Sequence, residues 1–304
     1  MSTTVEATAA VHNAGTFARL LLWLAKTAAL WIALLVSLMV AGKLVPVDMP
    51  MPRPDGPLTT MQALLVVNGL TAVALGLVAA LARVRGWRLG VVLFVAYFGI
   101  GSAMMQIETL WFNDSIHMAP AVIGQLVADA AIVGALVALV GMLLFRPIPQ
   151  EAEPVPANLA FRIGAMALIY VVLYYGAGFF IAWQSEAVRA YYDNGSHISL
   201  LPTVGFQIFR GTLWAMVSLF ILAHLKGSLA SRALVMAVLF AVMTDAQLLY
   251  PNPLLPWAVR QAHLVEVGTS EFIYGIVTTL VLLAGAVRRP LSAASRWRLI
   301  AGQA

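Results

Sequence analysis

The sequence contains no cysteine. Without thiols the chain can form no disulfide, hold no thiolate iron–sulfur cluster, attach no c-type haem and use no cysteine nucleophile. The His-Glu-x-x-His zinc helix, the Gly-x-Ser-x-Gly elbow and the phosphate-binding Gly-x-x-x-x-Gly-Lys-Ser/Thr loop are also missing. No lysine lies deep in a late apolar segment, so a retinal Schiff base is not expected. The chain lacks the sequence signature of each of these classes.

Charge is scarce as well: 10% of the residues are charged and 62% are apolar. A soluble domain of this size needs far more charge to cover its surface. A membrane-spanning helix needs about 20 mostly apolar residues, and such windows recur along the whole chain. We therefore predict an all-α integral membrane protein that passes several times through a cell membrane, the inner membrane of a bacterium.

The apolar windows predict eight transmembrane helices, at about 17–44, 58–82, 87–111, 119–145, 159–184, 201–225, 229–249 and 264–287. Proline and charge mark most of the breaks between them. The first apolar run is long and has no clear small-residue cleavage site, so we expect a retained helix and not a removed signal peptide. Residues 1–16 are expected to be a disordered cytoplasmic tail, 147–158 a cytoplasmic linker and 291–304 a basic cytoplasmic tail.

The positive-inside rule predicts the orientation. With the N-terminus inside, twelve basic residues fall on the cytoplasmic side and four on the other. An even number of spans then places both termini in the cytoplasm. Because the basic residues lie in short loops between helices, they indicate topology, and no nucleic-acid partner is expected.

The two halves of the chain resemble each other, which predicts a first four-helix repeat at 17–146 and a second at 159–290. Asn68-Gly69 and Arg210-Gly211 occupy matching places in the second helix of each half. The fourth helices carry Asp129 and Glu271 at matching places. With four helices per repeat, both copies enter the membrane in the same direction, which predicts parallel repeats related by an axis along the membrane normal.

Polar residues inside the predicted spans are the main candidates for function, because ionisable groups in a membrane are costly and usually face a bundle interior or a cavity. They gather in the outer half of the bundle. The candidates for ligand binding or proton coupling are Glu271, Glu266, His263, Arg210, Asp245, Asp129, Glu108 and Gln207. This set predicts a carboxylate-rich pocket open to the extracytoplasmic side, suited to a cation or a metal unless several carboxyls are protonated.

The sharpest local pattern is His263-x-x-Glu266-x-x-x-Ser270-Glu271-x-x-Tyr274. At 100° per residue most of these side chains share one helical face. His263, Glu266 and Glu271 could hold a divalent metal ion as a cofactor. The alternative is that His263 and Glu266 are solvated at the membrane interface.

Arg210 has two interpretations. As a structural residue it would pair with Asp129, Asp245 or Glu271, because a buried charge needs a partner. As a functional residue it would clamp an anionic head group. Glu108 lies at the outer end of its helix, where a glutamate can also be simply solvated.

Three functions remain open at this stage. The first is a transporter or permease for a small solute, which would use eight spans, a duplicated architecture and a polar pocket. The second is a membrane-embedded enzyme that acts on a lipid-like substrate at the outer leaflet. The third is a non-catalytic subunit that binds a quinone, a haem or a partner helix, with His117 and His263 as candidate haem ligands. Besides the lipid bilayer, the expected partner is a small-molecule or lipid-like ligand, and the oligomeric state is open.

Overall fold

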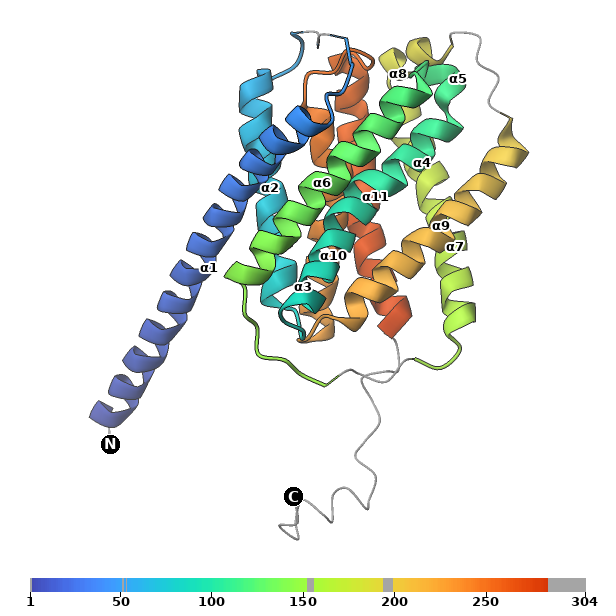
Figure 1. Cartoon of the computed structure of the whole chain (residues 1–304). Coiled ribbons are helices and arrows are strands. Elements are labelled where there is room, and N and C mark those ends of the chain that lie inside the picture. Colours follow the sequence, from blue (N-terminus) through green and yellow to red (C-terminus); the bar gives the residue numbers. More distant parts are fainter. Residues whose placement is uncertain (1, 51, 53, 152–155, 194–198, 284–304) are drawn as a thin grey trace.

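The chain folds into a bundle of helices (Figure 1). The computed structural model describes residues 2–50, 52, 54–151, 156–193 and 199–283, with side chains from Thr16 onward. The elements are α1 (Ser2–Leu44), α2 (Thr60–Ala80), α3 (Trp87–Phe94), η1 (Val95–Ala103), α4 (Met104–Trp111), α5 (Asn113–Ile116), α6 (Pro120–Leu144), α7 (Leu159–Phe180), η2 (Ala182–Gln184), α8 (Glu186–Tyr192), α9 (Leu200–Ala223), α10 (Leu229–Asp245), η3 (Ala246–Leu249) and α11 (Trp257–Leu283).

Eight helical segments among the described residues are long and apolar enough to cross a membrane. They are Thr16–Leu44, Thr60–Ala80, Trp87–Trp111, Pro120–Leu144, Leu159–Gln184, Leu200–Ala223, Leu229–Leu249 and Trp257–Leu283. Seven of them begin and end within two residues of the predicted spans. The predicted multi-pass helical membrane protein is confirmed.

The first and last described helices both begin earlier than predicted. Helix α1 begins at Ser2, whereas the sequence predicts a disordered tail over 1–16, and its first turns extend beyond the other helices (Figure 1). Helix α11 begins at Trp257, seven residues before the predicted start. Its early turns hold polar residues, which a hydropathy window leaves out although they continue the helix. The predicted tail at 291–304 and the end of the second predicted repeat lie outside the described residues.

Local sequence explains where several helices start. Thr59 caps α2, with its hydroxyl accepting from the Gln62 amide while the Gln62 side chain accepts from the Thr59 amide. Pro120 occupies the first turn of α6, where its missing N–H costs nothing. Ser228 caps α10 by accepting from the Ser231 amide. These caps set the loops between the spans.

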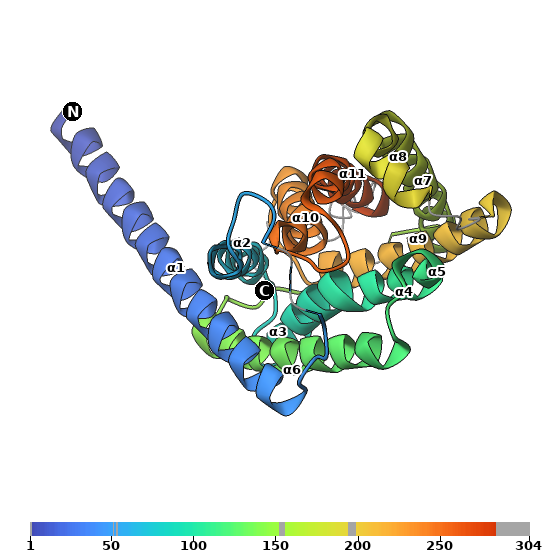
Figure 2. The ribbon, with the colours of Figure 1, turned by 90° about the horizontal axis from the view of Figure 1, so that it is seen from above.

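The helices pack in a similar way in each half. In the first half α1 packs against α2 and α6, and α3 packs against α6. In the second half α7 packs against α9 and α11, and α10 packs against α11. The halves meet where α2 contacts α10 and where α9 contacts η1. Figure 2 shows α1 at the edge of the bundle, with the other helices on one side of it.

The two ends of the bundle are built differently. At one end, here the bridge end, Ala82 and Leu225 form an isolated antiparallel bridge between the α2–α3 and α9–α10 turns. At the other end, here the clamp end, the fully buried Arg260 forms an ion pair with Asp55 in the α1–α2 loop. Arg260 also donates to the carbonyl oxygen of Leu255 at 3.0 Å and to that of Leu248 at 2.9 Å. One guanidinium thus joins two loops that are about 200 residues apart.

Apolar side chains fill the centre and also cover the outside. Trp214 and Phe240 are fully buried in the main core cluster. Leu201, Phe161 and Val172 are 81%, 77% and 70% exposed on the outside of the bundle. Such exposure is costly in water and is expected where the neighbour is lipid.

The third span contains a nine-residue π-helix, η1, between α3 and α4. Because a π-turn holds more residues than an α-turn, this segment rotates the side chains that follow it relative to a regular helix. Such segments often accompany functional sites. Here it sets the direction of the α4 side chains, including that of Glu108.

Candidate functional site

A bidentate ion pair between α9 and α4 organises the polar interior. Arg210 donates from Nη1 to Glu108 Oε1 at 2.7 Å and from Nη2 to Glu108 Oε2 at 2.6 Å. The Arg210 side chain is 3% exposed and that of Glu108 is 21% exposed. Gln207, one turn earlier on α9 and fully buried, accepts a longer bond from Nη1 at 3.3 Å. Both terminal nitrogens of Arg210 are therefore engaged by protein groups.

This pairing differs from the sequence prediction. The expected partners of Arg210 were Asp129, Asp245 or Glu271, and the structure pairs it with Glu108. The sequence places Glu108 at the outer end of its helix, where a glutamate can be simply solvated. The π-helix η1 changes the register just before α4, and hydropathy and 3.6-residue periodicity contain no signal for it.

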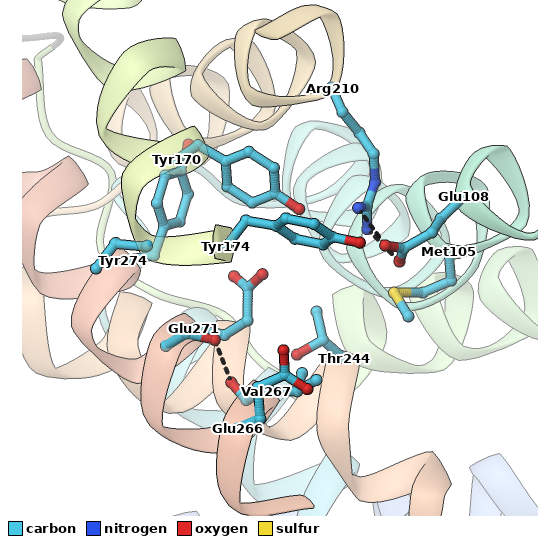
Figure 3. Close-up of a pocket in the computed structure, with 12 residues that line it drawn as sticks. Met105, Glu108, Tyr170, Tyr174, Arg210, Thr244, Glu266, Val267, Glu271 and Tyr274 are labelled. Carbon is cyan, nitrogen blue, oxygen red and sulfur yellow. Dashed lines mark hydrogen bonds and ion pairs between the residues drawn. The ribbon is translucent and has the colours of Figure 1, made fainter. Parts of the chain in front are cut away.

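A polar cavity lies beside this ion pair (Figure 3). The cavity has a volume of about 60 Å³, which is enough for a few water-sized groups. Five helices contribute to its wall. The lining residues are Met105, Glu108, Tyr170, Leu173, Tyr174, Arg210, Thr244, Glu266, Val267, Ser270, Glu271 and Tyr274.

Glu271 is the most unusual residue of the cavity. It is the fifteenth of the 27 residues of α11 and therefore lies near mid-helix. The residue is 8% exposed, and its Oε2 is buried with no hydrogen-bond partner among the described residues. In Figure 3 its carboxylate points towards the centre of the cavity, between Tyr274 and Tyr174. A carboxylate held this way needs a proton or a bound cation, because an unpaired buried charge is very costly.

Glu266 lines the part of the cavity nearer the clamp end, and His263 forms a hydrogen bond with it from outside the cavity wall. His263 Nδ1 lies 2.6 Å from Glu266 Oε2, and Tyr192 Oη lies 3.4 Å from His263 Nε2. Burial raises the pKa of the Tyr192 phenol above its ordinary value, so this hydroxyl stays protonated. His263 and Glu266 do share one helical face, but His263 is not part of the cavity wall.

Asp245 lies next to the cavity but outside its wall. Its Oδ1 is buried without a partner in the described part of the chain. A Cβ placed on Gly268 would be 2.9 Å from Asp245 Oδ2, so the carboxylate rests directly on α11. Gly268 precedes Glu271 by three residues, or roughly 4.5 Å along the helix. Asp245 and Glu271, each with one unpartnered oxygen, therefore lie at neighbouring turns of one helix–helix contact.

The remaining candidates are placed elsewhere. Asp129 is half-buried on α6 and does not line the cavity. His117 lies on an exposed position after α5, with φ of 57°, and makes no contact with His263 among the described residues. Within the same residues, no group of three or more His, Asp or Glu side chains is placed to hold a metal ion. The predicted trio of His263, Glu266 and Glu271 is thus only partly brought together.

Three polar lining residues were missed from the sequence. Tyr170 and Tyr174 are one turn apart on α7, and their spacing is the one signal that could have marked a polar aromatic face. Thr244 sits near the end of α10, where its hydroxyl donates to the Phe240 carbonyl at 2.8 Å, as many membrane threonines do. Ser270 and Tyr274 line the cavity as the predicted pattern on α11 suggests.

Comparisons with protein-family models, with curated proteins and with solved structures found no match for this chain. The cavity and its charges are therefore the only basis for a functional conclusion.

Proposed function

We propose that the protein transports a small solute and that Glu271 couples the transport to proton movement. The observation that carries the proposal is the Glu271 carboxylate, which lies near the middle of α11 in a cavity, with one buried oxygen unpartnered. A group of this kind is stable as the neutral acid or beside a cation. Binding of a solute that changes the charge next to Glu271 would then make this carboxyl group release or take up a proton.

The surroundings of Glu271 support this role. The charged and titratable groups that face it from the packed helices are Glu108 on α4, Tyr170 and Tyr174 on α7, Arg210 on α9, Asp245 on α10, and Glu266 and Tyr274 on α11. Arg210 is the one cation in this set, and its terminal nitrogens are occupied by Glu108. Glu271 therefore stays available to interact with a ligand that enters the cavity.

Three aromatic rings lie in contact on the side of the cavity that faces the bridge end. Trp214 and Phe240 have ring centroids 5.1 Å apart, and those of Phe240 and Tyr274 are 5.2 Å apart. Each ring belongs to a helix that also carries a charged or hydroxyl-bearing residue in the cavity wall. Within that helix, the ring lies about one turn closer to the bridge end. In a transporter, these three side chains would form the gate that opens to the second side.

We further propose that the chain consists of two parallel four-helix repeats with both termini in the cytoplasm. The equivalent helix contacts within each half support this arrangement. The antiparallel bridge between Ala82 and Leu225 joins equivalent turns of the two halves, as a two-fold axis along the membrane normal would require. The bridge end would then face the cytoplasm and the cavity the opposite side.

An enzyme that grips an anionic lipid head group has less support. The residue that would bind such a head group is Arg210, and both of its terminal nitrogens already donate to Glu108. An anion would have to displace this buried ion pair. Transport therefore ranks first.

The test is proton flux in proteoliposomes that contain a pH-sensitive dye. The purified full chain is reconstituted, and a panel of cationic, neutral and anionic solutes is added. We expect at least one solute to cause a pH change inside the vesicles that Glu271→Gln abolishes. The matched control is Asp129→Asn, which removes an intramembrane carboxylate outside the cavity. No flux for any solute, or an unaltered flux in Glu271→Gln, would overturn the proposal.

A further inference from the structure

The ionic groups that line the cavity are unbalanced in favour of negative charge. Three carboxylates and one guanidinium reach it. Arg210 neutralises Glu108 through two hydrogen bonds, which leaves Glu266 and Glu271. Even if His263 is protonated and balances Glu266, Glu271 remains without a counter-ion among the described residues.

Two aliphatic hydroxyls of the wall also favour a ligand that donates hydrogen bonds. The Thr244 hydroxyl donates to the Phe240 carbonyl at 2.8 Å, and the Ser270 hydroxyl donates to the Val267 carbonyl at 3.2 Å. Because each hydroxyl has a single proton, both oxygens offer lone pairs to the cavity. Together with the Glu271 carboxylate, these two oxygens are hydrogen-bond acceptors that line the cavity.

Aromatic rings supply a further part of the wall. Tyr170, Tyr174 and Tyr274 all line the cavity (Figure 3), and ring faces attract cations. The protein already uses one of them in this way, since the Arg210 guanidinium carbon lies 5.7 Å from the centroid of the Tyr170 ring. Rings of this kind suit an organic cation better than a metal ion, which requires several oxygen ligands.

We infer that the cavity binds a small organic cation, an alkylammonium or guanidinium compound of a few heavy atoms, with Glu271 as its counter-ion. The inference deepens the proposed transport function and rests on it for the direction of movement, but binding itself can be measured without transport. The size limit follows from the cavity, which has room for a few water-sized groups.

The test uses three small planar molecules of similar shape and different charge: guanidinium, urea and nitrate. Each is titrated calorimetrically into the purified full chain in detergent at constant ionic strength, with sodium chloride as the control for an inorganic cation. We expect guanidinium to bind, urea to bind at least about tenfold more weakly and nitrate not to bind, since charge complementarity sets the order. Equal binding of urea, preferential binding of nitrate, or competition by sodium at the same concentration would overturn the inference.

Two variants locate the site. Glu271→Gln should weaken guanidinium binding by at least about tenfold, whereas Asp129→Asn should leave it unchanged. If Glu271→Gln does not fold, Tyr174→Leu removes a ring without changing the charge and should also weaken binding. Unchanged binding in the folded variants would place the cation elsewhere and overturn the inference.

The two proposals fail separately. Guanidinium binding without proton flux for any solute would overturn transport and leave the cation site intact. Proton flux driven by an anion or a neutral solute, without guanidinium binding, would overturn the cation site and leave transport intact.

Discussion

Arg210 and Glu108, 102 residues apart in the sequence, form two parallel hydrogen bonds of 2.7 and 2.6 Å inside the bundle. The pair ties α9 to α4. It also decides how the cavity is charged, because it neutralises the one guanidinium of the cavity wall and engages both of its terminal nitrogens. A bidentate pair of this geometry is specific as well as strong.

Breaking this pair should be costly. Glu108→Ala leaves the Arg210 charge buried and unpaired, and we expect a loss of about 3–5 kcal/mol in the free energy of unfolding. The double variant Glu108→Leu/Arg210→Met removes both charges and should recover most of that loss. Unfolding in detergent, followed by circular dichroism, measures both. A double variant as unstable as the single one would show that the ion pair is not the source of the effect.

The contact between α10 and α11 depends on a glycine. A Cβ on Gly275 would lie 2.6 Å from the backbone of Ala237, so Gly275→Ala should push these helices apart and cost about 1–3 kcal/mol. Gly164→Ala on α7 is the matched control, because nothing lies within 4 Å of its added Cβ. The midpoint of thermal unfolding should fall in the first variant alone. Equal midpoints for the two variants would contradict the tight packing.

The clamp end predicts a change in loop protection. Asp55 accepts from the Trp257 amide at 2.6 Å and pairs with Arg260. Asp55→Ala removes both contacts and leaves the fully buried Arg260 without its carboxylate partner. Hydrogen exchange should become faster in the α1–α2 loop and in the first turn of α11, with little change at the bridge end. Unchanged exchange in that loop would show that other contacts hold it.

The absence of cysteine makes a direct test of orientation simple. Asp114 and Gln150 are exposed near opposite ends of the bundle, at the clamp end and the bridge end. In intact cells a membrane-impermeant maleimide should label Asp114→Cys, and should label Gln150→Cys only after the membrane is permeabilised. The reverse pattern would invert the proposed topology.

Much of the fold could be predicted from the sequence because its physical cause is local. Hydropathy locates the spans, and proline with charge locates their ends. The start of α11 was missed because Arg260 and His263 are polar although they are helical. Here the apolar window begins seven residues after the helix does.

The site was predictable only in part. Glu266, Glu271 and Arg210 stand out because ionisable residues are rare in spans, and all three reach the cavity. The partner of Arg210 depends on the π-helix η1, a change of register that no periodicity reports. Tyr170 and Tyr174 carry no signal beyond their spacing of one helical turn. Packing between helices determines which residues come into contact, and a single sequence does not contain this information.

Solute accumulation in proteoliposomes tests the central claim most directly. With guanidinium, or with the solute of the panel that drives the largest proton flux, uptake is measured under an imposed pH gradient and again as exchange at equal pH. The wild type should accumulate solute against its gradient. At a solute concentration raised to offset its weaker binding, Glu271→Gln should still exchange solute but fail to accumulate it, because the group that carries the proton is gone. Accumulation by Glu271→Gln at the wild-type level would contradict the account.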